Sequence, residues 1–379
     1  MMPPRRKWAR RMQRLHDEWL LVLFAALALL LAVLDPRPLD AYWRWLQWPT
    51  LAGLLGLLVA IQGIRDSGLV QHAAAALTAR THSLRSLGLL LVTATALLSM
   101  VLTNDVSLFL IVPLTMALGG SSNLPVARMV VLEALAVNAG STLSPIGNPQ
   151  NLLLWQHSQL SFLQFAWGML PAAAVMLALV VALTLYWVPK GPVTLMTPEH
   201  MHAVTTSRHL GAWSPLALLT MVLAMEYGHA TWGAALLLAA FAVCARSSLL
   251  RVDWPLLLTF AAIFLALGHV AELPAVQHLL AMLDFDQPLV LYASGIVAAQ
   301  LISNVPATVL LLNHTPDVMA LAVAVNVGGF GLAIGSLANL IALRLLRDPH
   351  GLRALHRISV PFLLICAPLV YLLLHWLHG

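Results

Sequence analysis

The sequence predicts an all-α polytopic membrane protein, and three observations support this prediction. Of the 379 residues, 60% are hydrophobic and only 9% are charged, whereas soluble globular chains carry about 25% charged residues. The mean hydropathy is +0.86. Apolar runs close to the ~20 residues that cross a bilayer recur along the whole chain. This composition excludes a soluble enzyme and a secreted disulfide scaffold.

Nine apolar runs are predicted to cross the membrane completely. They are 18–35, 48–64, 127–155, 162–189, 211–226, 229–245, 254–270, 317–343 and 358–376. Two further apolar stretches, 86–118 and 288–315, each contain a central polar cluster, and we predict that they form re-entrant hairpins. The first crossing follows a basic leader. A cleaved signal peptide is the alternative for that leader, but no small-residue cleavage site stands out before Asp35.

The basic residues orient these segments, because Lys and Arg concentrate in cytoplasmic loops. With nine crossings, two hairpins and a cytoplasmic N-terminus, every Lys and Arg except Arg37 and Arg44 falls on the cytoplasmic side. Turning either hairpin into a full crossing would move the later charges to the wrong side. The net charge of +5 therefore reflects orientation in the membrane and does not indicate affinity for nucleic acid.

Two halves of the chain share an ordered set of motifs. Trp48-Pro49 and Val70-Gln71-His72 match Trp254-Pro255 and Val276-Gln277-His278 at an offset of 206, and Thr103-Asn104 matches Ser303-Asn304 at an offset of 200. At an offset of 188, Asn138, Gly140, Ile146, Gly147, Asn151 and Leu152 match Asn326, Gly328, Ile334, Gly335, Asn339 and Leu340. The span at 48 runs inward and the span at 254 outward, so the repeats are predicted to be inverted.

The domain organisation follows from the repeats. Residues 1–47 are predicted to hold the leader and first helix, and 48–189 the first repeat, with hairpin 86–118 and broken helix 127–155. A cytoplasmic loop at 190–212 and connecting helices at 213–253 come next. The second repeat is predicted at 254–376, with hairpin 288–315 and broken helix 317–343.

Each repeat contains two polar interruptions, at 103–105 and 138–151 in the first and at 303–306 and 326–336 in the second. Unwound backbone at membrane depth is tolerated only where protein surrounds it or where it lines an aqueous cavity. Unwinding releases carbonyls that ligate a cation, and a helix N-terminus offers amides to an anion. Hairpin arms of about 10–17 residues would bring each tip near the midplane. A kinked helix held by polar side chains is the alternative for any single interruption.

These motifs resemble those of the ion transporter superfamily, which includes arsenite permeases, NhaD-type sodium/proton antiporters and divalent anion:sodium symporters. The runs that carry the resemblance are 102–106, 137–141, 145–151, 303–306 and 326–331. The resemblance is strongest to YbiR-type inner-membrane permeases and covers nearly the whole chain. The motifs are specific for the superfamily and nearly silent on the substrate.

The resemblance implies a scaffold domain that dimerises and a transport domain that moves as an elevator. Tips and broken helices would form paired sites from Thr103, Asn104, Asp105, Asn138, Gly140, Ser141, Thr142, Gly147 and Asn148 and from Ser303, Asn304, Asn326, Gly328, Gly329, Gly335 and Ser336. Sodium is implied near Asn104, Asp105 and Asn304. The sequence departs from the symporters at Asp105 and Val305, where they have Thr. Val305 offers no hydroxyl, and Asp105 adds a negative charge.

Asp105 is the outstanding single residue. An Asp at the bilayer centre costs about 2.5–3.5 kcal/mol on insertion scales, so an acid there is a functional candidate. The alternative is a helix cap that accepts hydrogen bonds from free amides of the second hairpin arm. Glu133 lies about one turn beyond Arg128, and we expect the two to form an ion pair at the membrane interface.

The sequence therefore predicts a secondary transporter of the bacterial inner membrane that carries a small inorganic or organic anion. The expected partners are that anion, the lipid bilayer and a second copy of the chain, and the only expected ligand besides is a coupling Na⁺ or H⁺. The alternative is a cation/proton antiporter that uses Asp105. Neither Lys7 nor Lys190 follows a glycine as a Walker A lysine does, and no HExxH motif is present.

Overall fold

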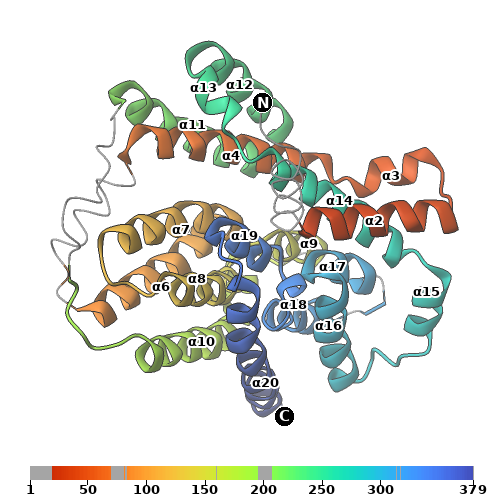
Figure 1. The fold of residues 1–379 in the computed structure, drawn as a ribbon. Helices are drawn as coiled ribbons and strands as arrows, with labels where there is room; N and C mark the ends of the chain where they lie inside the picture. Colours follow the sequence, from red (N-terminus) through yellow and green to blue (C-terminus); the bar gives the residue numbers. More distant parts are fainter. Residues whose placement is uncertain are drawn as a thin grey trace, which may run out of the picture. The chain divides into compact units, whose positions relative to one another are not determined.

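The computed structural model describes residues 19–69, 81, 83–158, 160–194, 207–312, 314–315 and 317–378, and these form an all-helical protein (Figure 1). The basic leader and the Val70-Gln71-His72 motif lie outside the described residues. Five described helices are long and apolar enough to cross a membrane: α4 (Trp48–Ser67), α6 (Leu84–Val101), α10 (Phe162–Trp187), α14 (Trp254–Ala271) and α20 (Gly351–His378). The prediction of an all-α membrane protein is confirmed.

The chain divides into two compact units, each built from two separate stretches of sequence. The first unit takes the described parts of Met1–Ser67 and Ser207–His278. Its helices, besides α4 and α14, are α2 (Trp19–Leu34), α3 (Leu39–Trp45), α11 (Arg208–Glu226), α12 (Ala230–Cys244) and α13 (Arg246–Leu250). In this unit α4 packs against α11 and α12, and α14 packs against α2.

Small residues allow close helix contacts in the first unit. A Cβ added at Gly56 of α4 would lie 2.1 Å from Met221 Sδ of α11, and one added at Gly268 would lie 2.5 Å from Trp45 Cγ. Polar side chains gather beside Trp45, where its indole donates to Glu272 Oε1 over 2.9 Å. His269 Nε2 lies 3.2 Å from Asp35 Oδ2, which also accepts from Arg37.

The second unit holds all four polar interruptions, in the described parts of Gly68–Thr206 and Leu279–Gly379. Besides α6, α10 and α20, its helices are α7 (Asn104–Ser121), α8 (Val126–Ser141), α9 (Pro149–Ser158), α16 (Pro288–Ile302), α17 (Asn304–Leu312), α18 (Val318–Val327), the 3₁₀ turn η2 (Ala333–Gly335) and α19 (Leu337–Leu346). The helix α15 (Pro274–Ala281) spans the point where the chain passes between the units.

The centre of the second unit is α8, which is buried at every position from Met129 to Ser141. The helices α6, α7 and α10 pack against α8, and α16 and α17 pack against α18 (Figure 1). The two halves of this unit therefore repeat one arrangement, in which a helix pair flanks an interrupted helix.

The helix boundaries agree with the predicted interruptions, with one difference in length. The predicted broken helix 127–155 is α8 followed by α9, and 317–343 is α18 followed by α19. In the second hairpin segment α16 has 15 residues and α17 has 9. In the first, α6 and α7 have 18 residues each, so the expected arm length was too short there. At 1.5 Å per residue each of these two helices is about 27 Å long.

Candidate functional site

The first interruption lies between α6 and α7. Leu102 and Thr103 adopt extended backbone conformations, and α7 begins at Asn104. Thr103 caps α7, since its hydroxyl accepts a hydrogen bond from Val106 N over 3.4 Å. The backbone amide of Asn104 donates to the carbonyl of Gly147 over 2.7 Å. The first tip is therefore bonded directly to the unwound segment between α8 and α9.

The second interruption, between α16 and α17, is strained. Ser303 has φ 74° and ψ 155°, a backbone region that costs a non-glycine residue about 1–3 kcal/mol. Ser303 and Asn304 are both buried. A Cβ added at Gly329 would lie 3.5 Å from Asn304 Nδ2 and 3.6 Å from Asn138 Oδ1. Side chains from both repeats thus converge on the backbone of Gly329.

The two broken helices are joined by a pair of crossed asparagine bonds. Asn138 Nδ2 of α8 donates to Asn339 Oδ1 of α19 over 3.0 Å. Asn326 Nδ2 of α18 donates to Asn151 Oδ1 of α9 over 2.6 Å. Asn138 and Asn326 are separated by 188 positions, as are Asn151 and Asn339. Each bond is thus the counterpart of the other under the repeat offset.

The acceptor oxygens of the central asparagines obey the same offset. Ser336 Oγ donates to Asn138 Oδ1 over 2.9 Å, and Asn148 Nδ2 donates to Asn326 Oδ1 over 2.9 Å. Ser336 lies 188 positions after Asn148. Thr142 Oγ1 also lies 3.3 Å from Asn326 Oδ1. Both central amides are therefore bound on their donor and acceptor sides.

Asn151 and Asn339 each also bind carbonyls that the unwound segments release. Asn151 Nδ2 donates to Ser141 O and Ser144 O over 3.2 and 3.0 Å, and Asn339 Nδ2 donates to Gly329 O and Leu332 O over 2.9 and 3.3 Å. These acceptors again correspond at an offset of 188. Because unpaired backbone groups are costly at membrane depth, these amides stabilise the unwound conformation.

Other side chains support the second unwound segment alone. Gln300 Nε2 donates to Gly328 O and Phe330 O over 2.5 and 2.6 Å, and Gln300 Oε1 accepts from Leu332 N over 2.7 Å. From α20, the hydroxyl of Ser359 accepts from Gly331 N, and His356 Nε2 accepts from Ala333 N. This segment is thus held by two neighbouring helices.

Glycines bring each broken helix against its flanking helix. A Cβ added at Gly140 would lie 2.3 Å from Ala96 O and 2.4 Å from Ser99 Oγ of α6. A Cβ added at Gly328 would lie 2.5 Å from Ala299 Cβ and 3.2 Å from Ile296 O of α16. The partners of the two glycines correspond at the offset of 200 found for the hairpin tips.

Asp105 lies at the first tip with 8% of its surface exposed. Its Oδ1 atom has no hydrogen-bond partner among the described residues. Thr103 fills the capping position, and the amide of Asp105 itself is bound by Asn104 Oδ1 over 2.9 Å. The alternative role of Asp105 as the cap of the second arm is therefore wrong.

The expected ion pair between Glu133 and Arg128 is also wrong. Glu133 is completely buried and accepts a hydrogen bond from Thr115 of α7. Arg128 is exposed, and its guanidinium donates to the carbonyl of Trp187 over 2.7 Å. The two side chains lie in different environments, one buried and one exposed, although they are only five positions apart on α8.

The structure gathers most predicted site residues but not all of them. Asn138, Ser141, Thr142, Asn148, Asn326, Gly329 and Ser336 belong to the hydrogen-bond network, and Asn104 joins it through Gly147. Within the described residues, no hydrogen bond joins Asn104 or Asp105 to Asn304. Site prediction missed Asn151, Asn339 and Gln300, although the 188-residue offset already marked the first two.

The described residues contain no group of three or more His, Cys, Asp and Glu side chains that could hold a metal ion. A cation at the interruptions would instead be bound by carbonyl, amide, hydroxyl and single carboxylate oxygens. Hard monovalent and divalent cations accept such oxygen ligands. The arrangement also leaves helix N-termini at α7, α9 and α19, which favour negative charge.

An all-helical chain with several helices that could span a bilayer, and with unwound segments buried among them, is a polytopic membrane protein. This chain belongs to the citrate transporter family (CitMHS), whose family model matches residues 11–315. It is similar to the inner membrane protein YbiR of Escherichia coli, with 41% identity over 334 residues, which is 87% of this chain and 88% of that protein.

Two more distant relatives are named as transporters. An uncharacterized transporter of Methanocaldococcus jannaschii is 29% identical over 335 residues, 87% of this chain and 90% of that protein. A silicon efflux transporter of rice is 30% identical over 162 residues, 42% of this chain and 33% of that protein. The family and these relatives make this chain a membrane transporter and not an enzyme.

Proposed function

We propose that the protein is a secondary active transporter of the bacterial inner membrane. It moves a small anion by an alternating-access mechanism that is coupled to a Na⁺ or H⁺ gradient. The observation that supports this proposal best is the crossed pair of asparagine bonds, Asn138–Asn339 and Asn326–Asn151. They join two interrupted helices, and in inverted-repeat transporters the substrate binds between such helices at the interface of the repeats.

The proposed topology has nine crossings, a cytoplasmic N-terminus, and two re-entrant hairpins at 86–118 and 288–315 within inverted repeats. Two observations support the repeats: the hydrogen bonds of the broken helices correspond at one offset, and the close glycine contacts correspond as well. The distribution of Lys and Arg supports the placement of both ends of each hairpin segment on one side of the membrane. By length and composition α6 could also cross the membrane alone, and the accessibility of the turn at Thr103 decides between a re-entrant hairpin and two crossings.

The two compact units suggest a division of labour. The unit with α7, α8, α17 and α18 holds every proposed binding residue and would be the moving transport domain. The unit with α4 and α14 would be the scaffold that dimerises. This division supports an elevator mechanism, in which the binding residues cross the membrane as one body. The repeat-based domain boundaries at 48–189 and 254–376 remain a proposal beside it.

The N-termini of α9 and α19, the second parts of the two interrupted helices, favour an anionic substrate. The helices α9 and α19 begin beside the unwound segments, at Pro149 and Leu337, and the helix dipole favours negative charge near a helix N-terminus. The family description names citrate, which is a small carboxylate, as the substrate of transporters of this kind. A small oxyanion or carboxylate is therefore the substrate class that we propose.

Transport by purified protein in proteoliposomes tests the function. Uptake of labelled citrate and phosphate should require an imposed Na⁺ or H⁺ gradient. Asn104→Ala and Asn304→Ala should each abolish uptake while folded protein remains in the membrane. Each side-chain amide is proposed to bind the substrate or ion at a tip where few backbone groups are available. Asn123→Ala, in an exposed loop of the same unit, should transport like the parent. Full uptake by both tip variants would reject the site.

A cation/proton antiporter is the second candidate, and Asp105 supports it. Its carboxylate is buried with one oxygen unpartnered among the described residues, so a cation or a proton could neutralise it in turn. Asp105→Asn should then remove the pH dependence of transport, whereas a merely structural Asp105 would leave the profile unchanged. Na⁺-driven proton movement without any anion uptake would replace the anion transporter by this alternative.

A further inference from the structure

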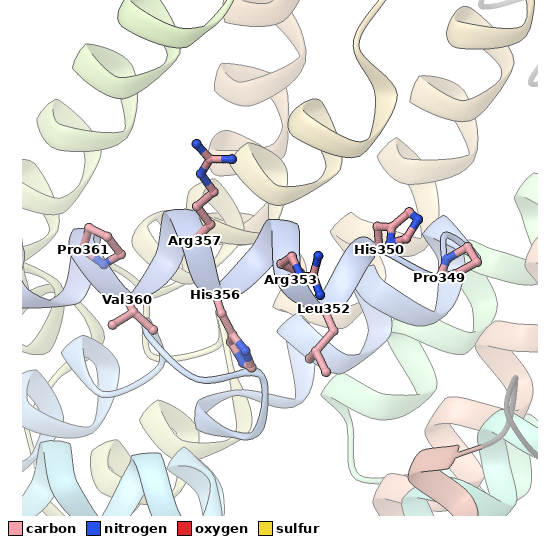
Figure 2. Close-up of a pocket in the computed structure, with 8 residues that line it drawn as sticks. All are labelled: Pro349, His350, Leu352, Arg353, His356, Arg357, Val360 and Pro361. Atoms are coloured by element: carbon pink, nitrogen blue, oxygen red, sulfur yellow. The ribbon is translucent and has the colours of Figure 1, made fainter.

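A pocket of approximately 870 Å³ lies along the first turns of α20 (Figure 2). His350, Arg353 and Arg357 follow one side of it at spacings of three and four residues, which places them on one face of a helix. Leu352, His356 and Val360 follow the neighbouring face of the helix and point downward in Figure 2, whereas Arg357 points upward. No acidic residue lines the pocket.

The positive charge of this pocket is not compensated by the described residues. Neither Arg353 nor Arg357 makes a hydrogen bond or ion pair there, and both are exposed. The neighbouring Asp348 is engaged, since its Oδ1 accepts from His350 N over 2.8 Å. Two guanidinium groups therefore face the pocket beside a single carboxylate. A surface of one charge sign raises the local concentration of ions of opposite charge.

One lining residue, His356, connects the pocket to the unwound segment. His356 Nε2 accepts from Ala333 N over 3.0 Å. One turn further along α20, Ser359 Oγ accepts from Gly331 N over 2.7 Å. The pocket thus adjoins the segment between α18 and α19, which supplies Gly328, Gly329, Gly335 and Ser336 to the proposed site.

We propose that His350, Arg353 and Arg357 form a second anion-binding site, in which a soluble phosphate or carboxylate anion binds before it reaches the unwound segment. Two arginines one helical turn apart suit an anion with several oxygens, because each guanidinium presents paired donors to such groups. The predicted topology puts this site on the cytoplasmic side. The statement that the bound anion is the transported substrate rests on the proposed function. The anion-binding site itself does not.

Thiol labelling at Leu352 tests this site without a transport assay. The exposed Cys244 is replaced by Ser, Leu352 is replaced by Cys, and the protein is placed in phosphatidylcholine nanodiscs. An anionic thiol reagent should react with Leu352→Cys about tenfold faster than a neutral reagent of similar size. Inorganic phosphate should slow the anionic reagent. The same protein without Leu352→Cys measures the background from buried Cys366.

Variants that remove the arginine charges test whether these charges cause the preference for the anionic reagent. In the Leu352→Cys protein, Arg353→Gln with Arg357→Gln should bring the two reaction rates close together, whereas Arg246→Gln, an exposed arginine of the other unit, should leave the preference intact. Equal rates in the protein with both arginines, or an undiminished preference in the double variant, would overturn the proposal. Loss of the fold is excluded by comparing the thermal unfolding of each variant with the parent.

A lipid headgroup shares the chemistry of a soluble anion, and a second lipid composition separates the two. If phosphatidylglycerol in the nanodisc protects Leu352→Cys but phosphate does not, the pocket binds lipid and the proposal is overturned. Protection by phosphate in phosphatidylcholine supports it. That result would stand even if reconstituted protein moved no anion, so failure of the proposed function and failure of this site are distinguishable.

Discussion

Ser303 concentrates backbone strain at the second hairpin tip. Its counterpart Thr103 has φ −73°, an ordinary extended conformation, whereas Ser303 has φ 74°. Strain of this kind persists only where surrounding structure enforces it, and it is common at binding sites. Ser303 N donates to Ala299 O, and Ser303 O accepts from Ala307 N. The two tips are therefore not equivalent, although the repeats are similar.

Ser303→Gly should stabilise the protein. Relief of about 1–3 kcal/mol of strain exceeds the roughly 0.5–1 kcal/mol that glycine costs by its freedom in the unfolded chain. The lost hydroxyl matters little, because its bond to Asn304 Oδ1 is long at 3.4 Å. Ser303→Ala removes the hydroxyl but keeps the strain, so it should not raise the melting temperature. Thermal unfolding in detergent measures both, and equal shifts would contradict the strain argument.

The environment of single residues was predictable for Asp105 but not for Glu133. Asp105 was singled out as an acid within an apolar stretch, and its side chain is buried, while its role stays a prediction. The partner of Glu133 was not predicted, because helical spacing to Arg128 says nothing of Thr115 on another helix. Burial and cross-helix contacts are tertiary properties, and periodicity within one helix does not contain them.

At the scale of elements, the interruptions were predictable and their contacts were not. Gly, Pro and Asn inside apolar runs mark where helices end, and α8, α9, α18 and α19 begin or end within a few residues of the expected places. The bond between Asn138 and Asn339 joins positions 201 residues apart. The offset of 188 residues marks Asn138 and Asn339 as equivalent to Asn326 and Asn151. It does not show that Asn138 and Asn339 are in contact.

Gly140→Ala should destabilise the contact between α6 and α8. The added Cβ would lie 2.3 Å from the backbone oxygen of Ala96, and backbone cannot turn aside as a flexible side chain does. Overpacking of this kind costs about 1–3 kcal/mol. Gly120→Ala is the matched control, since no atom lies within 4 Å of its added Cβ. The melting temperature should fall for the first variant alone, and equal stability of both would contradict this packing.

At the scale of the whole molecule, the membrane topology is decided by the turn between α6 and α7. Ser86 is exposed at the start of α6, and Gly120 lies near the end of α7. If 86–118 is a re-entrant hairpin, both ends lie in the cytoplasm. If α6 and α7 cross separately, both ends again share one side, but the turn at Thr103 then reaches the periplasm. Accessibility of the turn and of both ends distinguishes these arrangements.

Single cysteines provide this measurement in a protein without Cys244. An impermeant thiol reagent added to intact cells should label Leu39→Cys, in the predicted periplasmic loop, and leave Ser86→Cys and Gly120→Cys unlabelled until the membrane is permeabilised. Thr103→Cys should stay unlabelled from outside if the tip ends within the membrane. Labelling of Thr103→Cys as rapid as that of Leu39→Cys would mean two full crossings in place of a hairpin.

The crossed asparagine bonds also have a consequence for biosynthesis. When Asn138 has left the ribosome, another 201 residues must be made before its acceptor Asn339 exists. At about 5–20 residues per second this delay is roughly 10–40 s. During that time the amide nitrogen of Asn138 and the amide oxygen of Asn151 lack their final partners in the lipid, where unpaired polar groups are costly. Nascent chains of this protein should therefore linger at the insertion machinery until the second half emerges.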